Sequence, residues 1–137
     1  MTLAFLGEKS GGQVSEIISK LREINSPKFS FSAKGVLLLP HDSFARVFCA
    51  KIEPSPQLLE LHKKITATLS VEEGCEYRPH VTLARLKGRR NLEKLVELKN
   101  ALAEKDFGTG EIASFYLKKS VLSQQGPEYG ELARFPL

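Results

Sequence analysis

The chain has few cysteines and no long hydrophobic run, and both shortages exclude classes of protein. Only two of its 137 residues are cysteine. Cys49 and Cys75 belong to no C-x-x-C motif and have no histidine at a metal-binding spacing, which argues against a disulfide framework and favours reduced thiols. No apolar run is long enough to cross a bilayer, and the apolar start, Met1–Gly7, lacks the basic flank of a signal peptide. We therefore expect a cytoplasmic protein without a membrane partner.

Low-complexity and linker-like segments are absent as well, so the chain shows no boundary between separate domains. Its length is enough for one domain with a core of its own. The hydrophobic fraction of 42% and the charged fraction of 26% are those of an ordinary soluble globular protein. A net charge of +4 permits an anionic partner but is too small to require one. We predict a single domain over residues 1–137.

The hydrophobic periodicity predicts strands and helices that alternate along the chain. The predicted strands are Thr2–Leu6, Phe29–Ser32, Val36–Leu39, Arg46–Ile52, Tyr77–Leu86, a piece near Phe107, Ala113–Leu122 and Glu131–Phe135. The predicted helices are Val14–Asn25, a helix opened by Pro54 and Pro56 that carries Leu58, Leu59, Leu61, Ile65 and Leu69 on its apolar face, and a helix capped by Asn91 that reaches Leu102. Glycine and proline separate most of these segments.

One short stretch of sequence occurs twice. The segment Thr2–Leu6, TLAFL, aligns with Thr82–Leu86, TLARL, at an offset of 80 positions and with four identities in five. Each copy continues with a polar turn, an amphipathic helix and a strand that opens at a phenylalanine. Chance recurrence among apolar strands is the alternative, and the matching order of elements argues against it. Two copies of one unit predict two intertwined lobes related by an approximate two-fold axis, with a site built from equivalent positions.

The second copy is preceded by a segment that the first copy lacks. A predicted strand and helix lie before Thr82, and about 33 residues, Val47–His80, have no counterpart before Thr2. The position equivalent to His80 would fall just before Met1. We therefore expect an N-terminally truncated fold that lacks its first strand and helix.

The sequence His80-Val81-Thr82 lies on a predicted strand and carries groups suited to phosphate chemistry. Residues two apart on a strand face the same side, so the imidazole and the hydroxyl project together. An imidazole titrates near neutral pH and can move a proton, and a hydroxyl can donate a hydrogen bond to a phosphoryl oxygen. Taken alone, H-x-T is a weak signal, because a single histidine on a strand is more often structural. Arg85 lies on the other face of an ideal strand and reaches the site only if the strand twists or ends.

The other histidines carry no motif. His41 follows a proline in a loop and His62 lies among charged residues of a predicted helix, so we expect both at the surface. No ligand cluster predicts a metal site. A basic run follows the predicted strand, and its members are Arg85, Lys87, Arg89 and Arg90. This run is either a solvated turn or an electrostatic approach path for RNA phosphates, and the sequence does not decide between them.

Three segments together resemble the RNA 2',3'-cyclic phosphodiesterases, or 2'-5' RNA ligases, of the two-histidine phosphoesterase superfamily. Tyr77–Arg85, YRPHVTLAR, resembles the second H-x-T signature of that family. Thr2–Glu8, TLAFLGE, resembles the tail of the first signature, and Gly126–Leu137 resembles the closing strand. The resemblance implies a bilobed α+β fold in which two pseudo-symmetric antiparallel sheets flank a groove and helices pack outside.

The resemblance also implies a function. Family members are hydrolases in RNA processing that open a 2',3'-cyclic phosphate to a 2'-phosphate, and some join or cleave 2'-5' linkages. One histidine acts as general base and the other as general acid, with no metal and no cofactor. Carried over by position, His80 is catalytic, Thr82 and Thr2 hold the phosphate, and Arg85 is a further phosphate contact. Phe5 would lie near the nucleotide base, although core packing explains it equally well. The implied partner is RNA or a nucleotide with a cyclic phosphate end, bound by a monomer.

The chain departs from the family pattern at the first histidine, because Met1 stands where the middle residue of that H-x-T belongs. An acid–base pair that lacks one member loses on the order of a hundred- to ten-thousand-fold in rate. The leading expectation is therefore a cyclic phosphodiesterase that is impaired as given. The alternatives are a catalytically silent RNA- or nucleotide-binding domain and a decayed fragment that does not fold alone.

Overall fold

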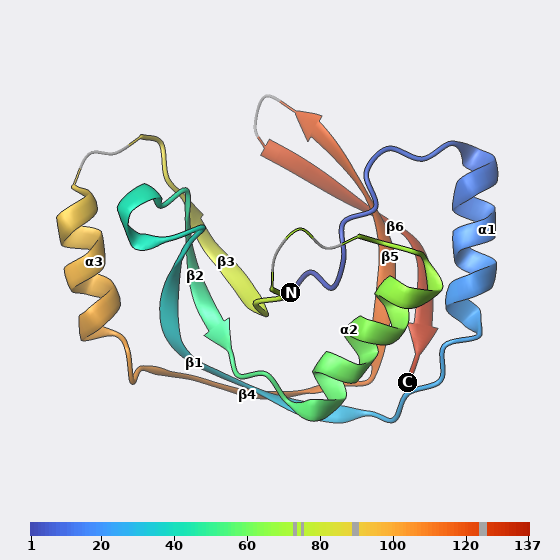
Figure 1. Cartoon of the computed structure of the whole chain (residues 1–137), viewed down its shortest axis with the longest axis horizontal. Helices are drawn as coiled ribbons and strands as arrows, with labels where there is room; N and C mark the ends of the chain where they lie inside the picture. The colour runs from blue at the N-terminus through green and yellow to red at the C-terminus, as the bar shows by residue number, and fades with distance from the viewer. Residues whose placement is uncertain (73, 75, 89–90, 124–125) are drawn as a thin grey trace. The chain divides into compact units, whose positions relative to one another are not determined.

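The computed structural model describes the chain except for residues 73, 75, 89–90 and 124–125 (Figure 1). Its elements, in chain order, are α1 (Gly11–Arg22), β1 (Phe29–Leu39), the short 3-10 helix η1 (Asp42–Phe44), β2 (Val47–Ile52), α2 (Pro56–Thr68), β3 (His80–Arg85), α3 (Leu92–Ala101), β4 (Asp106–Ile112), β5 (Ser114–Ser123) and β6 (Gly126–Pro136). The pairings of β1 with β2, β2 with β3 and β5 with β6 are antiparallel. The α+β class is confirmed.

The chain folds into two compact units. Unit 1 comprises the ranges Met1–Leu3, Ser30–Ser55 and Glu73–Gly110, and unit 2 comprises Ala4–Phe29, Pro56–Glu72 and Glu111–Leu137. Unit 1 therefore holds η1, β2, β3 and α3 with most of β1 and β4, whereas unit 2 holds α1, α2, β5 and β6. Because each unit takes segments from three parts of the chain, neither can be cut out as one continuous piece.

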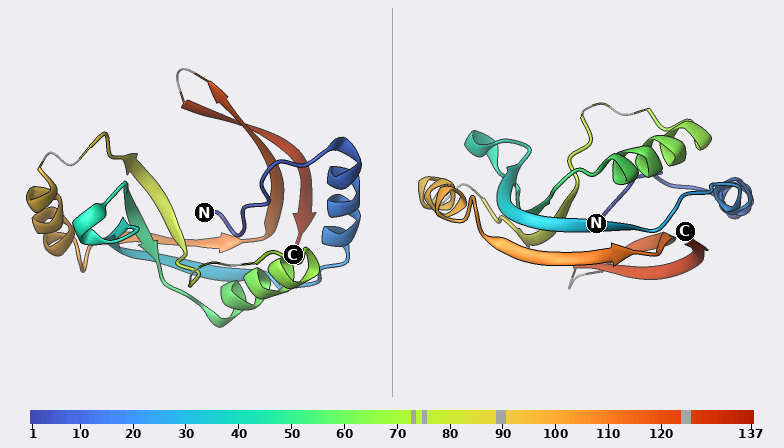
Figure 2. Two further views of the ribbon diagram at one scale, coloured as in Figure 1. Left: turned by 45° about the horizontal axis from the view of Figure 1, so that its top comes forward. Right: turned by 90° about the horizontal axis from the view of Figure 1, so that it is seen from below.

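Unit 1 is built on a sheet of strand order β3-β2-β1-β4, in which β1 and β4 run side by side (Figure 2). One face of this sheet carries the core. Its buried residues are Val36, Leu38, Ala45 and Phe48, and the side chains packed against them are Leu86, Leu92, Leu95, Val96 and Leu102. Most of the latter come from α3 and its C-terminal end, so this helix covers the core face. Since side chains alternate along a strand, Leu37 and Cys49 fall on the opposite face.

β1 is one continuous strand, so the prediction of two strands separated at Gly35 is wrong. The register between β1 and β2 shifts between Ala33 and Val36, which marks a bulge that contains Gly35. Gly35 has a φ of +73°, and its N–H donates to the carbonyl of Lys105 at 2.8 Å. A glycine adopts this left-handed conformation without the strain that a Cβ introduces, so the strand bends here instead of ending.

Unit 2 combines two helices with a long hairpin of β5 and β6. α1 packs against α2 and β6. Its buried residues are Ile17 and Leu21, and the apolar residues that α2 buries are Leu58, Leu61 and Ile65. In the hairpin, Phe115 and Phe135 are opposite one another and buried, with stacked rings 4.9 Å apart. Aromatic pairs at this separation stabilise a fold by about 1 kcal/mol beyond the area that they bury.

The helices begin close to where the sequence predicts, but not all their caps agree. α1 begins with a capping box, in which Ser10 N donates to Gln13 Oε1 at 2.9 Å and Gln13 N donates to Ser10 Oγ. Pro56 opens α2 as expected. Asn91 precedes α3, but its side chain makes no capping hydrogen bond, because the residue has a φ of 60° instead of the extended backbone of a cap.

The predicted strand at Thr2–Leu6 is not formed. These residues carry no regular secondary structure, although they are apolar and β-compatible. A strand exists only where a neighbour completes its ladder of backbone hydrogen bonds, and no strand among the described residues pairs with this segment. Its apolar pattern was therefore insufficient as a predictor.

His62 is buried, so the prediction of a surface histidine is wrong. Only 3% of the residue is exposed, and it lies with Leu58 and Thr66 on the buried side of α2. Positions four apart on a helix share a face, so His62 follows Leu58 into the interior regardless of its charged sequence neighbours.

The bulge in β1 predicts a specific sensitivity to substitution. In Gly35→Ala, the added Cβ would lie 2.4 Å from the carbonyl oxygen of Ala103, a backbone atom that cannot rotate away. The clash adds to the left-handed strain of about 1–2 kcal/mol. We expect Gly35→Ala to lower the free energy of unfolding by about 3 kcal/mol or more, measured by urea denaturation.

Gly7→Ala is the matched control. Gly7 has a similar φ of +66°, and nothing lies within 4 Å of the Cβ that would be added. Only the strain should remain, so the loss should be about 1–2 kcal/mol. Equal losses in the two variants would show that the close approach of Ala103 to Gly35 does not exist in solution.

Candidate functional site

The predicted H-x-T residues lie on β3, which forms one edge of the unit 1 sheet. His80 is the first residue of this strand and is half-buried, whereas Thr82 is exposed. In the register with β2, His80 lies opposite Lys51 and Thr82 lies opposite Cys49. Because directly opposite residues of an antiparallel pair share a face, these four side chains lie on one face of the sheet.

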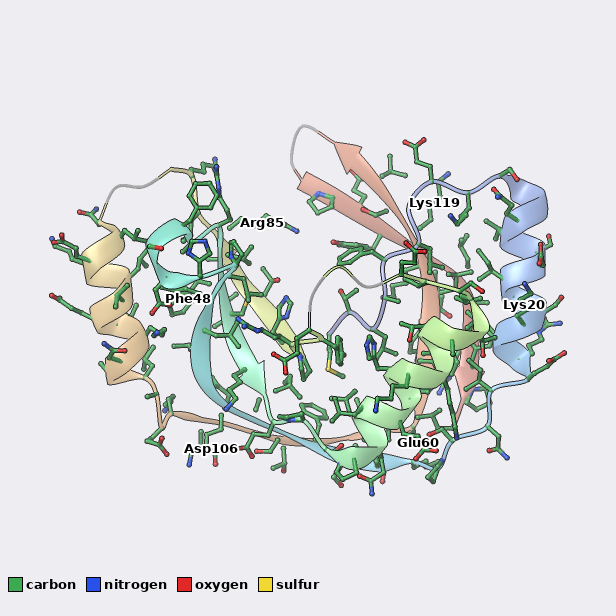
Figure 3. All side chains as sticks on the ribbon, in the orientation of Figure 1. Lys20, Phe48, Glu60, Arg85, Asp106 and Lys119 are labelled. Atoms are coloured by element: carbon green, nitrogen blue, oxygen red, sulfur yellow. The ribbon has the colours of Figure 1, made fainter. Side chains whose placement is uncertain are left out.

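A bulge brings Arg85 onto the same face. Cys49 pairs with Thr82 and Phe48 pairs with Ala84, so Leu83 is an extra residue on β3. The strand then resumes its alternation with Arg85 opposite Val47. Val47 and Cys49 are two apart on β2 and face the same side, and their partners Arg85 and Thr82 therefore do so too. In an ideal strand the odd spacing would place Arg85 on the opposite face from Thr82, but the extra residue Leu83 brings it back to the same face. Figure 3 labels Arg85 on β3.

The surroundings of the Cys49 thiol agree with this arrangement. Cys49 is fully buried, with 0% of its surface exposed. Burial raises the pKa of its thiol above the ordinary value, whereas a hydrogen bond from the Thr82 hydroxyl and the positive charge of Arg85 lower it in part. Both groups must lie close to the sulfur to act in this way. Thr82, Arg85 and Cys49 are thus neighbours in space as well as in register.

The hydrogen bonding of His80 assigns the tautomer of its ring. Nδ1 lies 2.7 Å from the carbonyl oxygen of Arg78. A carbonyl only accepts, so Nδ1 carries the proton, and in the neutral ring the lone pair is on Nε2. That nitrogen is the one able to take a proton from a nucleophile or, once protonated, to give one to a leaving group.

Thr2 is tied to the segment that leads into β3. The Tyr77 hydroxyl donates a hydrogen bond to the carbonyl oxygen of Thr2 at 3.2 Å. Tyr77 lies three residues before His80, and both belong to unit 1 with Thr2. The start of the chain and the H-x-T strand are therefore part of one compact unit.

Phe5 belongs to unit 2 and is 85% exposed, which excludes the core-packing explanation of this residue. It lines a surface pocket of about 270 Å³. The pocket is lined further by Leu6, Lys9, Gln13, Glu16, Ile17, Lys20, Leu69, Ser70 and Val71. An aromatic ring beside the two lysines Lys9 and Lys20 suits a nucleotide.

The sequence singled out several further residues besides those of this surface. His41 is exposed, as predicted, and its Nδ1 lies 2.9 Å from Ser43 Oγ. Cys75, Arg89 and Arg90 lie outside the described residues. Within the described part of the chain, no three His, Cys, Asp or Glu side chains are close enough to hold a metal ion. Likewise, no helix found there is both long and apolar enough to span a membrane.

Sequence analysis did not identify Cys49 and Lys51 as site residues. Val47, Cys49 and Lys51 alternate along one predicted strand, so their common face could have been recognised. The sequence did not predict that this strand pairs with Tyr77–Leu86, and it did not predict the bulge that sets the register. Lys51 adds a cation opposite His80 on a surface that already carries Arg85.

Comparisons with known proteins agree with one another. Residues 1–116 match the family model of the 2'-5' RNA ligase superfamily. An RNA 2',3'-cyclic phosphodiesterase of Aeropyrum pernix is 34% identical over 137 aligned residues, which cover 96% of this chain and 78% of the relative. A crystal structure of a Thermus thermophilus protein superimposes with a TM-score of 0.79 at 24% identity, covering 99% of this chain and 76% of that one. Escherichia coli LigT, complexed with 3'-AMP, gives a TM-score of 0.76 at 22% identity, with coverage of 99% and 75%.

The influence of the Arg85 charge on the Cys49 thiol predicts a change in thiol reactivity. In a Cys75→Ser background, Cys49 should react with iodoacetamide far more slowly in the folded protein than in urea, because the thiolate is the nucleophile and burial raises the pKa. Arg85→Gln removes a charge that stabilises the thiolate. We expect it to slow alkylation roughly threefold further at fixed pH, as measured by mass spectrometry.

Lys87→Gln is the control for this effect. It makes the same charge change two residues along, at an exposed side chain that does not influence the Cys49 thiol. An equal effect of Arg85→Gln and Lys87→Gln, or none of either, would contradict the shared face that the bulge produces.

Proposed function

Because the chain belongs to the 2'-5' RNA ligase superfamily, we propose that it is an RNA 2',3'-cyclic phosphodiesterase that acts in the cytoplasm on RNA ends. The observation that carries the proposal is the hydrogen bond of His80 Nδ1 to the Arg78 carbonyl, which leaves the Nε2 lone pair for proton transfer on a strand face that also carries Thr82 and Arg85. One proton-transfer group, one hydroxyl donor and one fixed cation are what an attack on a phosphodiester requires.

The reaction would proceed by in-line displacement at phosphorus. Water attacks the cyclic phosphate, the bond from phosphorus to the ribose 3' oxygen breaks, and the product is a 2'-phosphate with a free 3'-hydroxyl. One imidazole removes the proton of the water and a second protonates the leaving 3' oxygen. His80 supplies one of these two functions through Nε2. When the 5'-hydroxyl of another RNA strand replaces water, the same displacement forms a 2'-5' linkage, which is the ligase reaction.

The remaining residues stabilise negative charge. The phosphoryl oxygens gain charge as the nucleophile adds, and hydrogen-bond donors already in place stabilise that charge without rearranging. We assign this role to the hydroxyls of Thr82 and Thr2 and to the guanidinium of Arg85. A guanidinium forms two parallel hydrogen bonds to a phosphate and so fixes its orientation. For Phe5 we propose a stacking contact with the nucleotide base.

The 137 residues contain one H-x-T histidine, since the position two residues before Thr2 is not among them. His80 supplies one half of the acid–base pair, and we propose that turnover without a second histidine falls by about a hundred- to ten-thousand-fold. The same observation favours a second candidate function, a nucleotide- or RNA-binding domain without turnover. It would use the same donors for the phosphate, as binding requires no proton transfer.

The test is hydrolysis of a nucleoside 2',3'-cyclic phosphate in the presence of EDTA. We compare the 137-residue chain, a version extended so that a histidine directly precedes Met1, and His80→Ala in each. The extended version should hydrolyse the substrate at least about a hundredfold faster than the chain as given, and His80→Ala should remove that gain. His41→Ala, which changes an exposed histidine of unit 1, is the matched control and should leave the rate unchanged.

The outcomes separate the candidate functions. Activity that depends on His80 supports the two-histidine reaction, and formation of the 2'-phosphate rather than the 3'-phosphate supports the stated bond cleavage. A folded, extended protein that binds 2'-AMP but hydrolyses no cyclic phosphate would replace the enzyme by the binding domain. A broad, non-cooperative thermal transition of the 137-residue chain would show that it does not fold alone.

A further inference from the structure

The β5–β6 hairpin of unit 2 has two chemically different faces. Phe115 and Phe135 are buried on one face. Their chain neighbours Tyr116 and Arg134 are directly opposite one another on the other face. On β5, this second face carries Ser114, Tyr116, Lys118 and Ser120. On β6, Arg134 is opposite Tyr116. After a bulge at Leu132, Glu131 is opposite Lys118 and Tyr129 is opposite Ser120. The four residues Tyr116, Lys118, Tyr129 and Arg134 are called the tyrosine face.

Both tyrosines of this face are open to solvent. Tyr116 is 42% exposed and Tyr129 is 62% exposed. Tyrosine rings are usually covered to a larger extent, because their apolar faces are poorly hydrated. Two such rings on one face of one hairpin are available to stack against a planar partner.

The cations hold one of the rings in place. The guanidinium carbon of Arg134 lies 5.8 Å from the centroid of the Tyr116 ring, and Lys118 Nζ lies 5.7 Å from it. The Ser114 hydroxyl also donates to the Tyr116 hydroxyl at 3.1 Å. These three contacts hold the Tyr116 ring in place before any ligand binds. A ring that is already held loses less conformational entropy when a ligand binds.

The charge of this face is unbalanced. Neither Lys118 nor Arg134 forms an ion pair with a carboxylate among the described residues, although Glu131 lies opposite Lys118 in register. Both cations therefore keep their charge for a ligand while they flank an exposed aromatic ring. Cations that track a phosphate backbone, interleaved with aromatic rings, are the pattern that binds single-stranded nucleic acid.

We propose that the tyrosine face is a docking surface for single-stranded RNA. Tyr116 and Tyr129 stack on bases, while Lys118 and Arg134 contact phosphates. Ser120, the partner of Tyr129, is four residues from Tyr116, roughly 13 Å along the strand. Stacked neighbouring bases are about 3.4 Å apart, so the two rings engage bases that are not adjacent in the RNA. Stacking is tolerant of base identity, and the surface therefore has little sequence preference.

The choice of RNA as the strand rests on the proposed function, in which an RNA end is the substrate. A second surface that contacts the strand gives the protein affinity for RNA that a mononucleotide lacks. It would lower the KM for an oligonucleotide with a cyclic phosphate end and leave that of a nucleoside cyclic phosphate unchanged.

The test measures binding of a fluorescent single-stranded RNA of twelve nucleotides with a 3'-hydroxyl end, by anisotropy with the full chain. Because this RNA carries no cyclic phosphate, binding is measured without any turnover. Tyr116→Ala and Tyr129→Ala should each weaken binding roughly tenfold, and Tyr116→Phe should retain it, as stacking needs only the ring. The double variant Lys118→Gln with Arg134→Gln should reduce the slope of log Kd against log salt by about 1.4, which corresponds to two phosphates.

Lys119→Gln is the matched control. Lys119, labelled in Figure 3, is exposed and adjacent in the chain to Lys118, but it alternates to the other face of the hairpin. It should leave the affinity nearly unchanged. Thermal melts of the tyrosine variants check that the fold is retained, since both side chains are exposed.

Wild-type affinity in both tyrosine-to-alanine variants would overturn the proposal. So would an equal loss of affinity in Lys119→Gln and in the double variant Lys118→Gln with Arg134→Gln. Self-association that is lost with the tyrosines, measured by sedimentation in the absence of RNA, would also overturn it and assign the face to a second copy of the chain. Failure of the phosphodiesterase assay with RNA binding retained would sink the proposed function alone. Turnover of cyclic nucleotides without RNA binding would sink the docking surface alone.

Discussion

The pairing of β3 with β2 is the constraint on which the candidate site depends. A shift of that register by one residue would turn His80 and Thr82 toward the core face and move Val81 out. The register is held by the burial of the β2 residues, since Phe48, Cys49 and Ala50 are all buried and cannot exchange faces without loss of packing. The bulge at Leu83 then corrects the position of Arg85. A stable interior strand thus determines the geometry of an exposed edge strand.

An edge position suits the chemistry but is a liability for the fold. β3 exposes unpaired backbone groups on its outer side, and such strands tend to pair with other chains. Short length and charge reduce that tendency, and β3 has only six residues and ends in Arg85. Two apolar side chains of this strand, Val81 and Leu83, are nevertheless exposed, and they add to the tendency to pair. Because β3 is an edge strand, the side chains of His80 and Thr82 are open to a substrate. An interior strand with neighbours on both sides and helices over it would not give this access.

Local sequence predicted most elements of this fold and the identity of its chemical groups, because helical and strand periodicities are properties of short segments. Its failures concern partners. The Thr2–Leu6 segment has a strand pattern but no ladder partner among the described strands, and His62 has polar neighbours in sequence but apolar ones on its helix face. Cys49 became a site residue only through its pairing with Thr82. The H-x-T motif was recognised from its own residues. Its neighbours in space depend on how β3 pairs with β2, and no short segment of the sequence specifies that pairing.

The balance between hydrolysis and ligation follows from what is bound beside the reacting phosphorus. The displacement is the same in both reactions, and the histidine does not distinguish water from a 5'-hydroxyl. Water is far more concentrated than any RNA end, so joining strands requires that the second strand be held in place with a high effective concentration. In the proposed reaction, residues of β3 contact one phosphate and supply no such hold. A surface that stacks bases and binds phosphates away from the reacting end would supply it, so ligation depends on RNA contacts outside the H-x-T strand, whereas hydrolysis of a cyclic nucleotide does not.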